Sequence, residues 1–125
     1  MNENGRIVVH KFESSLLRSN ALKDPFVRDV IVYLPPNYQK SKTEKYLSVI
    51  LLPSFGSNAR ALLNIDPLSE NIEQRLNRLI RRKRIGPMIV VIPDCFTKFG
   101  GNQYINSTGT GMYESYITKE IVPFI

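Results

Sequence analysis

The strongest constraint on the fold is an apolar stretch that ends abruptly in a polar loop. Residues 46–53 are almost entirely apolar, and residues 54–58 are Ser, Phe, Gly, Ser and Asn. An apolar, β-branched run bounded by Pro, Gly, Ser and Asn is typical of a buried strand that ends in a tight loop. In sheets covered by helices on both faces, ligands bind beside loops at the carboxyl ends of strands. We therefore look for chemistry first in this loop.

Segments that favour strands and segments that favour helices alternate along the rest of the chain. Strands are predicted over 6–17, 29–34, 47–52 and 88–92, with a charged connector over 39–45. Residues 88–92 are apolar on both faces, which predicts a central strand with parallel pairing. A long loop rich in Gly, Asn, Ser and Thr is predicted over 93–111.

One helix is predicted over 67–83 and a second from Gly111 onward. Asp66 is a suitable N-cap, Pro67 suits the first helical position, and Gly86 can close the C-terminus. Two apolar stripes at helical spacing would face the sheet: Leu68, Ile72, Leu76, Leu79 and Ile80 in the first helix, and Tyr113, Tyr116, Ile117 and Ile121 in the second. Because no repeat or linker interrupts this pattern, residues 1–125 are predicted to form a single α/β domain with a mostly parallel sheet flanked by helices.

The composition limits the classes of function. No apolar run approaches the roughly 18 residues that span a bilayer, and the first residues lack the apolar stretch of a signal peptide. We therefore expect a cytoplasmic protein without a membrane partner. Cys95 and His10 are the only cysteine and histidine, so the sequence offers no CxxC pair and no zinc-type ligand set. No metal and no cofactor are predicted.

The net charge of +6 permits attraction to anionic partners. Much of this charge belongs to one segment, with Arg75, Arg78, Arg81, Arg82, Lys83 and Arg84. A solvated helix face with cations near its C-terminus is one interpretation, and a phosphate-binding patch is the other. The first is favoured, because no nucleic-acid motif and no stacking aromatic residues accompany the cluster. Nucleic acid is therefore not predicted as a partner.

Four segments, taken in order, resemble a known enzyme family. They are residues 27–38, ending in Tyr-Leu-Pro-Pro-Asn-Tyr, residues 51–58, residues 85–94, ending in Ile-Pro-Asp, and residues 113–125. Their order and spacing are similar to the amino-terminal half of the esterase family of α/β-hydrolases, which includes enterochelin-esterase-like and S-formylglutathione-hydrolase-like enzymes. This resemblance implies hydrolysis of a small carboxylic ester through a Ser-His-acid triad.

The resemblance also implies that this chain lacks the nucleophile. The family carries its serine in a Gly-x-Ser-x-Gly elbow on the strand after the helix that ends here at Ile125, and the acid and histidine come later. The sequence contains no such elbow. We therefore expect an incomplete α/β-hydrolase domain, truncated before the nucleophile strand and inactive as an isolated chain. The alternative is a non-catalytic interaction module, which pairs through the basic helix or through an open, self-associating edge formed by Val49, Ile50, Leu51 and Leu52.

Three residues are candidates for the remaining site. By position in the family motif, Phe55 would donate its backbone N–H to the oxyanion, although a plain strand-to-helix turn is the alternative. Asp94 would bind substrate at the end of the fourth strand or, the commoner role of aspartate, cap its own loop. Gln103 lies in a segment, residues 100–104, whose amides and aromatic ring suit acyl or alcohol recognition.

No other residue is a convincing replacement for the nucleophile. Ser54 and Ser57 flank Gly56 without an evident activating base. Cys95 follows a strand end, yet a lone cysteine without a nearby histidine is more often a packing residue. His10 is predicted to lie on the first strand near the sheet edge, remote from this loop.

Overall fold

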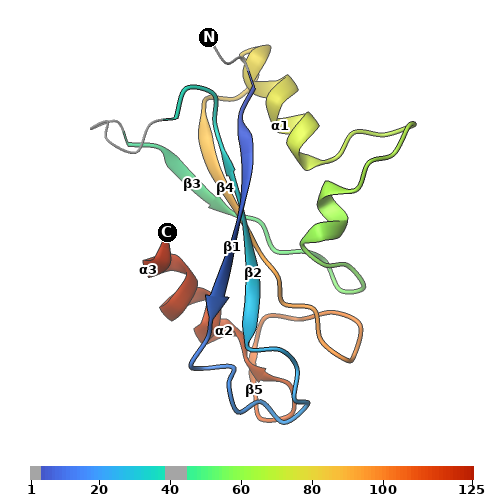
Figure 1. Ribbon diagram of the computed structural model, residues 1–125, viewed down its shortest axis with the longest axis vertical. Helices are drawn as coiled ribbons and strands as arrows, with labels where there is room; N and C mark the ends of the chain where they lie inside the picture. Colours follow the sequence, from blue (N-terminus) through green and yellow to red (C-terminus); the bar gives the residue numbers. More distant parts are fainter. Residues whose placement is uncertain (1–3, 39–44) are drawn as a thin grey trace.

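Four strands form the main sheet of the protein, whose computed structural model describes residues 4–38 and 45–125 (Figure 1). The strands are β1 (Arg6–Glu13), β2 (Val27–Leu34), β3 (Leu47–Ile50) and β4 (Met88–Pro93). Their order in space is β1-β2-β4-β3. Most of the connector predicted over 39–45 lies outside the described residues.

The sheet is mixed, so the prediction of a mostly parallel sheet needs correction. β1 pairs with β2 and β2 with β4 in antiparallel fashion, while β3 and β4 are parallel. Parallel pairing needs a long crossover, and here the crossover is the segment between β3 and β4 that contains a helix. β1 and β2 instead pair as a hairpin-like unit over eight residue pairs, which the chain achieves without any helix between them.

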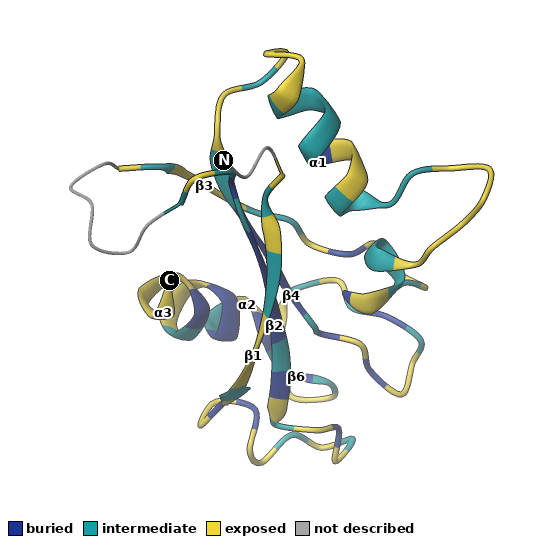
Figure 2. Cartoon of the chain, turned by 45° about the horizontal axis from the view of Figure 1, so that its top comes forward, coloured by how far each residue is buried: buried dark blue, intermediate teal, exposed yellow. Residues whose placement is uncertain are grey.

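β4 is buried on both faces, as residues 88–92 predicted. Val91 packs with Tyr113, Tyr116 and Ile121 on one face, whereas Val90 and Ile92 pack in a second core on the other face. Figure 2 shows β2 and β4 buried in the middle of the sheet, with β1 and β3 more exposed at its two edges. The two cores explain why a sheet of this composition needs helices on both sides.

The remaining elements are short. They are η1 (Arg60–Leu63), α1 (Ile72–Arg81), β5 (Asn106–Ser107), β6 (Gly111–Met112), α2 (Tyr113–Ser115), the π-helical segment η2 (Tyr116–Ile121) and α3 (Val122–Phe124). The pair β5–β6 is a small antiparallel hairpin inside the predicted loop over 93–111. The predicted apolar stripe of the last helix is confirmed, because Tyr113, Tyr116, Ile117 and Ile121 are all buried.

Helix α1 begins five residues later than predicted. Asn71 is its N-cap, and a capping box joins the Asn71 side chain to the Gln74 N–H and the Gln74 side chain to the Asn71 N–H. Asp66 instead accepts a hydrogen bond from the Leu68 N–H in a local turn. Leu68, which the periodicity directed toward the sheet, is 94% exposed. The prediction of Asp66 as the N-cap is therefore wrong, because the capping box of Asn71 and Gln74 starts the helix.

The C-terminus of α1 also differs from prediction. The Arg84 N–H donates to Leu79 O and the Lys83 N–H donates to Ile80 O, the two bonds of a Schellman motif. Lys83, at φ +57°, occupies the left-handed position that was expected to need Gly86. In the basic cluster, both Arg75 and Arg78 form ion pairs with Glu70, which lies just before the helix.

β1 ends at Glu13, four residues before the predicted end of the first strand. The chain turns at Ser14, whose hydroxyl donates to the Glu120 carboxylate and accepts from the Leu17 N–H. Leu17 is then buried in the core beneath the last helical segment rather than in a strand. His10 lies on β1 as predicted, exposed, with its ring edge-on to Phe124.

The helices in the described part of the chain are all too short or too polar to cross a lipid bilayer.

We expect Asn71→Ala to lower the free energy of unfolding by about 1 kcal/mol, because it removes the bond that the Asn71 side chain accepts from the Gln74 N–H at the start of α1 and the bond that it donates to Leu63 O. Asp66→Ala is the matched control, since Asp66 caps only a local turn. Urea unfolding of both variants measures the difference. An equal or larger loss for Asp66→Ala would place the N-cap at Asp66 after all.

Candidate functional site

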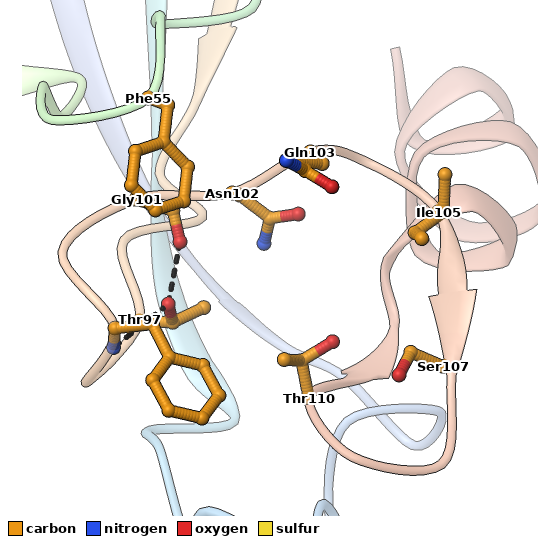
Figure 3. A pocket seen from close by; sticks show the side chains of 9 residues that line it. Phe55, Thr97, Gly101, Asn102, Gln103, Ile105, Ser107 and Thr110 are labelled. Carbon is orange, nitrogen blue, oxygen red and sulfur yellow. Dashed lines mark hydrogen bonds between the residues drawn. The ribbon is translucent and has the colours of Figure 1, made fainter.

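The turn after β3 and the loop after β4 enclose a cavity of about 320 Å³. β3 and β4 are parallel, so their carboxyl ends lie side by side and bring these two segments together. The cavity is lined by Phe55, Thr97, Phe99, Gly101, Asn102, Gln103, Ile105, Ser107 and Thr110 (Figure 3). Two of the three predicted site residues, Phe55 and Gln103, therefore share one cavity.

The turn that carries Phe55 is tight and well defined. The Ser57 N–H donates to Ser54 O at 2.9 Å, and Gly56 adopts φ +89° at the position where such a turn needs a left-handed residue. Serines at the other positions therefore do not prevent the turn. Within the described residues, no acceptor is bonded to the Phe55 N–H. The ring of Phe55 is 58% exposed and forms one wall of the cavity.

The two segments pack backbone against backbone. A Cβ on Gly101 would lie 2.6 Å from Gly56 N and 2.9 Å from Phe55 Cα, so this contact requires glycine. Beside it, the Tyr104 hydroxyl donates to Pro53 O at 2.5 Å. Because both contacts join the β3 turn to the β4 loop, these two walls of the cavity are held against each other without any ligand.

The polar residues of the cavity divide into two groups. Thr97 donates to Gly101 O at 2.5 Å and Asn102 donates to Cys95 O at 2.9 Å, so both side chains hold the loop in shape. The side chains of Gln103 and Thr110 have no hydrogen-bond partner within the described residues. These two can bind the polar groups of a ligand.

The apolar lining favours a flat, apolar ligand. Phe99 is 63% exposed and Ile105 is 54% exposed, and together with Phe55 they present apolar surface to the cavity. Aromatic side chains bind aromatic groups through stacked or edge-on contacts. Sequence reasoning missed Phe99 and Ile105. The signal available was the presence of large apolar residues in a loop otherwise composed of Gly, Asn, Ser and Thr.

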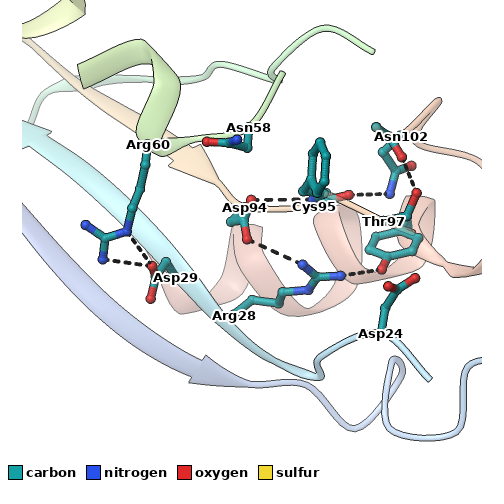
Figure 4. Close-up of polar contacts among 12 residues, drawn as sticks. Asp24, Arg28, Asp29, Asn58, Arg60, Asp94, Cys95, Thr97 and Asn102 are labelled. Carbon is teal, nitrogen blue, oxygen red and sulfur yellow. Dashed lines mark hydrogen bonds and ion pairs between the residues drawn. The ribbon is translucent and has the colours of Figure 1, made fainter. Parts of the chain in front are cut away.

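Asp94 lies beside this cavity but does not line it. Its carboxylate accepts from the Phe96 N–H at 3.4 Å and faces Arg28 Nη1 at 3.4 Å (Figure 4). It borders a separate hollow together with Asn58, Arg60 and Phe96. This geometry fits the alternative in which Asp94 caps its own loop.

Arg28 is a buried residue that sequence reasoning did not single out. It is 3% exposed, and its Nη2 donates to the Tyr113 hydroxyl at 2.7 Å (Figure 4). Burial is the principal cause that raises the pKa of Tyr113, and Arg28 acts against it. Through Asp94 and Tyr113, Arg28 connects β2 to the β4 loop and to the last helical segment.

Cys95 is a packing residue in this structure. It is 2% exposed and belongs to the core beneath the last helical segment. Burial raises the pKa of the Cys95 thiol to about 12, although Arg28 acts in the opposite direction. A thiol in this state holds its proton and is a poor nucleophile.

Across residues 4–38 and 45–125, no basic side chain is hydrogen-bonded to the hydroxyl of Ser54 or Ser57. His10 lies on β1, at the opposite edge of the sheet from β3. Among the described residues, no three His, Cys, Asp or Glu side chains gather closely enough to hold a metal ion. What the described residues of the site offer is hydrogen-bonding groups and apolar walls.

The fold is shared with ferulic acid esterases. One such structure superposes with a TM-score of 0.70 at 21% identity, covering 99% of this chain and 42% of the esterase. A ferulic acid esterase from Anaeromyces mucronatus gives a TM-score of 0.62 at 20% identity, covering 98% and 43%. A mutant of the feruloyl esterase module from Clostridium thermocellum, solved with sinapinate, gives 0.58 at 26% identity, covering 80% and 29%.

The chain thus spans about two fifths of the length of the first of these enzymes. A scan against protein-family models and a search of curated proteins each returned no match. The shared fold supports the esterase part of the predicted resemblance. This structural similarity does not distinguish the enterochelin-esterase-like or S-formylglutathione-hydrolase-like grouping that the sequence suggested.

Because Cys95 is buried and its pKa is raised to about 12, the native thiol should react with iodoacetamide about a hundredfold or more slowly at pH 8 than the thiol of the urea-unfolded chain. Mass spectrometry of timed samples follows the reaction, and no second cysteine complicates it. Equal rates in the two states would contradict the buried placement.

Proposed function

We propose that this chain forms the acyl-binding and oxyanion wall of an α/β-hydrolase-type carboxylic esterase. One observation carries the proposal: a single cavity joins the turn that holds the Phe55 amide to the apolar surface of Phe99 and the free side chain of Gln103. An ester substrate presents the same combination, a carbonyl oxygen beside an acyl group.

The oxyanion role of Phe55 rests on the turn. Stabilisation of a tetrahedral oxyanion needs a backbone donor that is fixed before the reaction and is not used by the protein. The Phe55 N–H has no acceptor within the described residues, and the turn around it is closed by the bond between Ser54 and Ser57. Removal of one such donor typically costs a hundredfold to a thousandfold in rate.

An aromatic acyl group fits this cavity. Phe55 and Phe99 supply ring surfaces, and Gln103 and Thr110 supply unpaired polar groups for substituents on a ligand ring. Proteins of the same fold are described as ferulic acid esterases, and one was solved with sinapinate. We therefore propose hydroxycinnamate esters as the substrate class, with Gln103 rather than Asp94 as the polar contact.

The 125 residues alone should not hydrolyse esters. Ser54 and Ser57 have no base beside them, Cys95 is buried and protonated, and the sequence contains no Gly-x-Ser-x-Gly. A second polypeptide segment with the nucleophile would complete the enzyme. What the chain can do by itself is bind the acyl group.

We expect ferulate to bind the chain in the fast-exchange regime and to shift the NMR amide signals of Phe55, Gly56 and Gln103, without turnover of a chromogenic acetate ester. Phe99→Ala should weaken ferulate binding severalfold, since an aromatic contact contributes about 0.5–1.5 kcal/mol. Phe96→Ala is the matched control, because Phe96 is also part-exposed on this loop but borders the other hollow.

Ferulate shifts confined to other surfaces, or equal effects of the two phenylalanine variants, would contradict the acyl site. Robust ester turnover by the purified chain would contradict the inactive state.

A second candidate function is self-association through β3. This strand lies at the edge of the described sheet, next to β4 alone, and Leu47, Val49 and Leu52 are 66%, 37% and 40% exposed. Apolar edge strands with unpaired backbone groups pair readily with other strands. The basic helix is a weaker alternative, since Arg75 and Arg78 are already paired with Glu70. We propose a second copy of the chain as the partner.

If β3 mediates self-association, Val49→Lys should give a monomer at concentrations where the unmodified chain is a dimer, because a charge on the edge opposes strand pairing. Val9→Lys is the matched control: Val9 is 40% exposed on β1, the opposite edge strand. Size-exclusion chromatography with light scattering measures both. A monomeric unmodified chain at all concentrations would rule out this function.

A further inference from the structure

The carbonyl of Pro53 is the point at which the β3 turn is tied to the rest of the site. It accepts the 2.5 Å hydrogen bond from the Tyr104 hydroxyl, two residues before Phe55. The neighbouring contact, between Gly101 and residues Phe55 and Gly56, is close van der Waals packing without a hydrogen bond between those residues. Tyr104 therefore supplies the directional part of the attachment, and Gly101 supplies the close fit.

Tyr104 is held in place by an unusual backbone conformation. Its φ is +58°, a left-handed value that non-glycine residues adopt at an energetic cost. The Tyr104 N–H donates to Asn102 Oδ1 at 2.7 Å, and Asn102 Nδ2 donates to Cys95 O at 2.9 Å. Strain that is maintained by specific hydrogen bonds is often found where a side chain must be aimed.

The ring of Tyr104 packs against the core that contains Cys95, so the phenol cannot swing freely. Burial also raises the pKa of Tyr104 above its usual value, so the hydroxyl keeps its proton in neutral solution and remains a donor. The attachment to Pro53 is therefore present throughout the pH range in which the protein would work.

We propose that Tyr104 is a positioning residue, whose hydrogen bond to Pro53 O fixes the location of the Phe55 amide relative to the acyl cavity. This inference rests on the proposed function, because it gives Tyr104 a role in oxyanion binding through Phe55. The reason is geometric: a turn anchored two residues before its donor cannot shift without breaking that bond. A displacement of about 1 Å at such a donor is enough to cost a large factor in catalysis.

The test compares Tyr104→Phe with Tyr33→Phe. Each change removes one hydroxyl group and leaves the ring in place. Tyr104→Phe removes the 2.5 Å bond to Pro53 O, and Tyr33→Phe removes the 2.7 Å bond to Asn77 Oδ1. Tyr33 belongs to the core on the other face of the sheet. Unfolding curves establish that both variants are folded and lose similar stability.

Two ligands distinguish a shift of the Phe55 amide from a general loosening of the cavity. Ferulate carries a carboxylate, whereas coniferyl alcohol has the same ring and side chain with an alcohol in its place. We expect Tyr104→Phe to weaken ferulate binding about fivefold, the usual worth of one hydrogen bond, and to leave coniferyl alcohol binding unchanged. Tyr33→Phe should change neither. Equal weakening of both probes by Tyr104→Phe would mean that Tyr104 only supports the cavity, which overturns the proposal.

Amide hydrogen exchange tests the role of Tyr104 in holding the turn independently of whether the cavity binds an ester. If the unmodified chain binds neither probe, the esterase site is refuted, and exchange at Ser57, whose N–H is bonded to Ser54 O, still tests the attachment. Faster exchange of the Ser57 amide in Tyr104→Phe, but not in Tyr33→Phe, would support positioning of the turn. Unchanged exchange in Tyr104→Phe would overturn it.

Discussion

The burial of β4 on both faces is the constraint on which the rest of the structure depends. Val91 faces one core, while Val90 and Ile92 face the other, so the strand must have a helical layer on each side. α1 covers one face and the segment that includes α2, η2 and α3 covers the other (Figure 1). The segments that line the cavity are the turn after β3 and the segment after β4 that leads into α2.

The site follows from the parallel pairing of β3 and β4. Parallel strands end at the same edge of a sheet, so the turn at residues 54–57 and the loop after Pro93 start side by side. Two further contacts bring them into a fixed relation: the close approach of Gly101 to Phe55 and the bond from Tyr104 to Pro53. The cavity is thus a consequence of strand topology, and one glycine and one hydroxyl group join the two segments that border it.

Local patterns predicted the burial of β2 and β4 but not the exposure of β3, whose Leu47 and Val49 are 66% and 37% exposed at the sheet edge, and they predicted the element ends poorly. Val90, Val91 and Ile92 are apolar in a row and are buried on both faces, whereas the similar run from Val49 to Leu52 lies at the sheet edge, so an apolar run alone does not fix burial. The start of α1 was predicted at Asp66, and the structure places it at Asn71, which forms a reciprocal capping box with Gln74. The stripe containing Leu68 was extended one turn too far for the same reason. The end of β1 was set by Glu120, more than a hundred residues away in the chain, which no local pattern contains.

The sequence by itself determined that residues 88–92 are buried on both faces, that helices lie on both faces of the sheet, and that residues 54–57 form a turn, because hydrophobic periodicity and turn chemistry are local properties. The strand before that turn, predicted to be buried, is instead an exposed edge, since only the strand order decides which strand lies outermost. The sequence also excluded a Gly-x-Ser-x-Gly elbow. Only the tertiary structure decided that Phe55 and Gln103 share a cavity, that Asp94 is turned toward Arg28 instead, and that the sheet is mixed. These outcomes depend on which strands become neighbours and on contacts such as that of Gly101 with Phe55 and Gly56, where no side chain would fit. Both involve residues far apart in the chain.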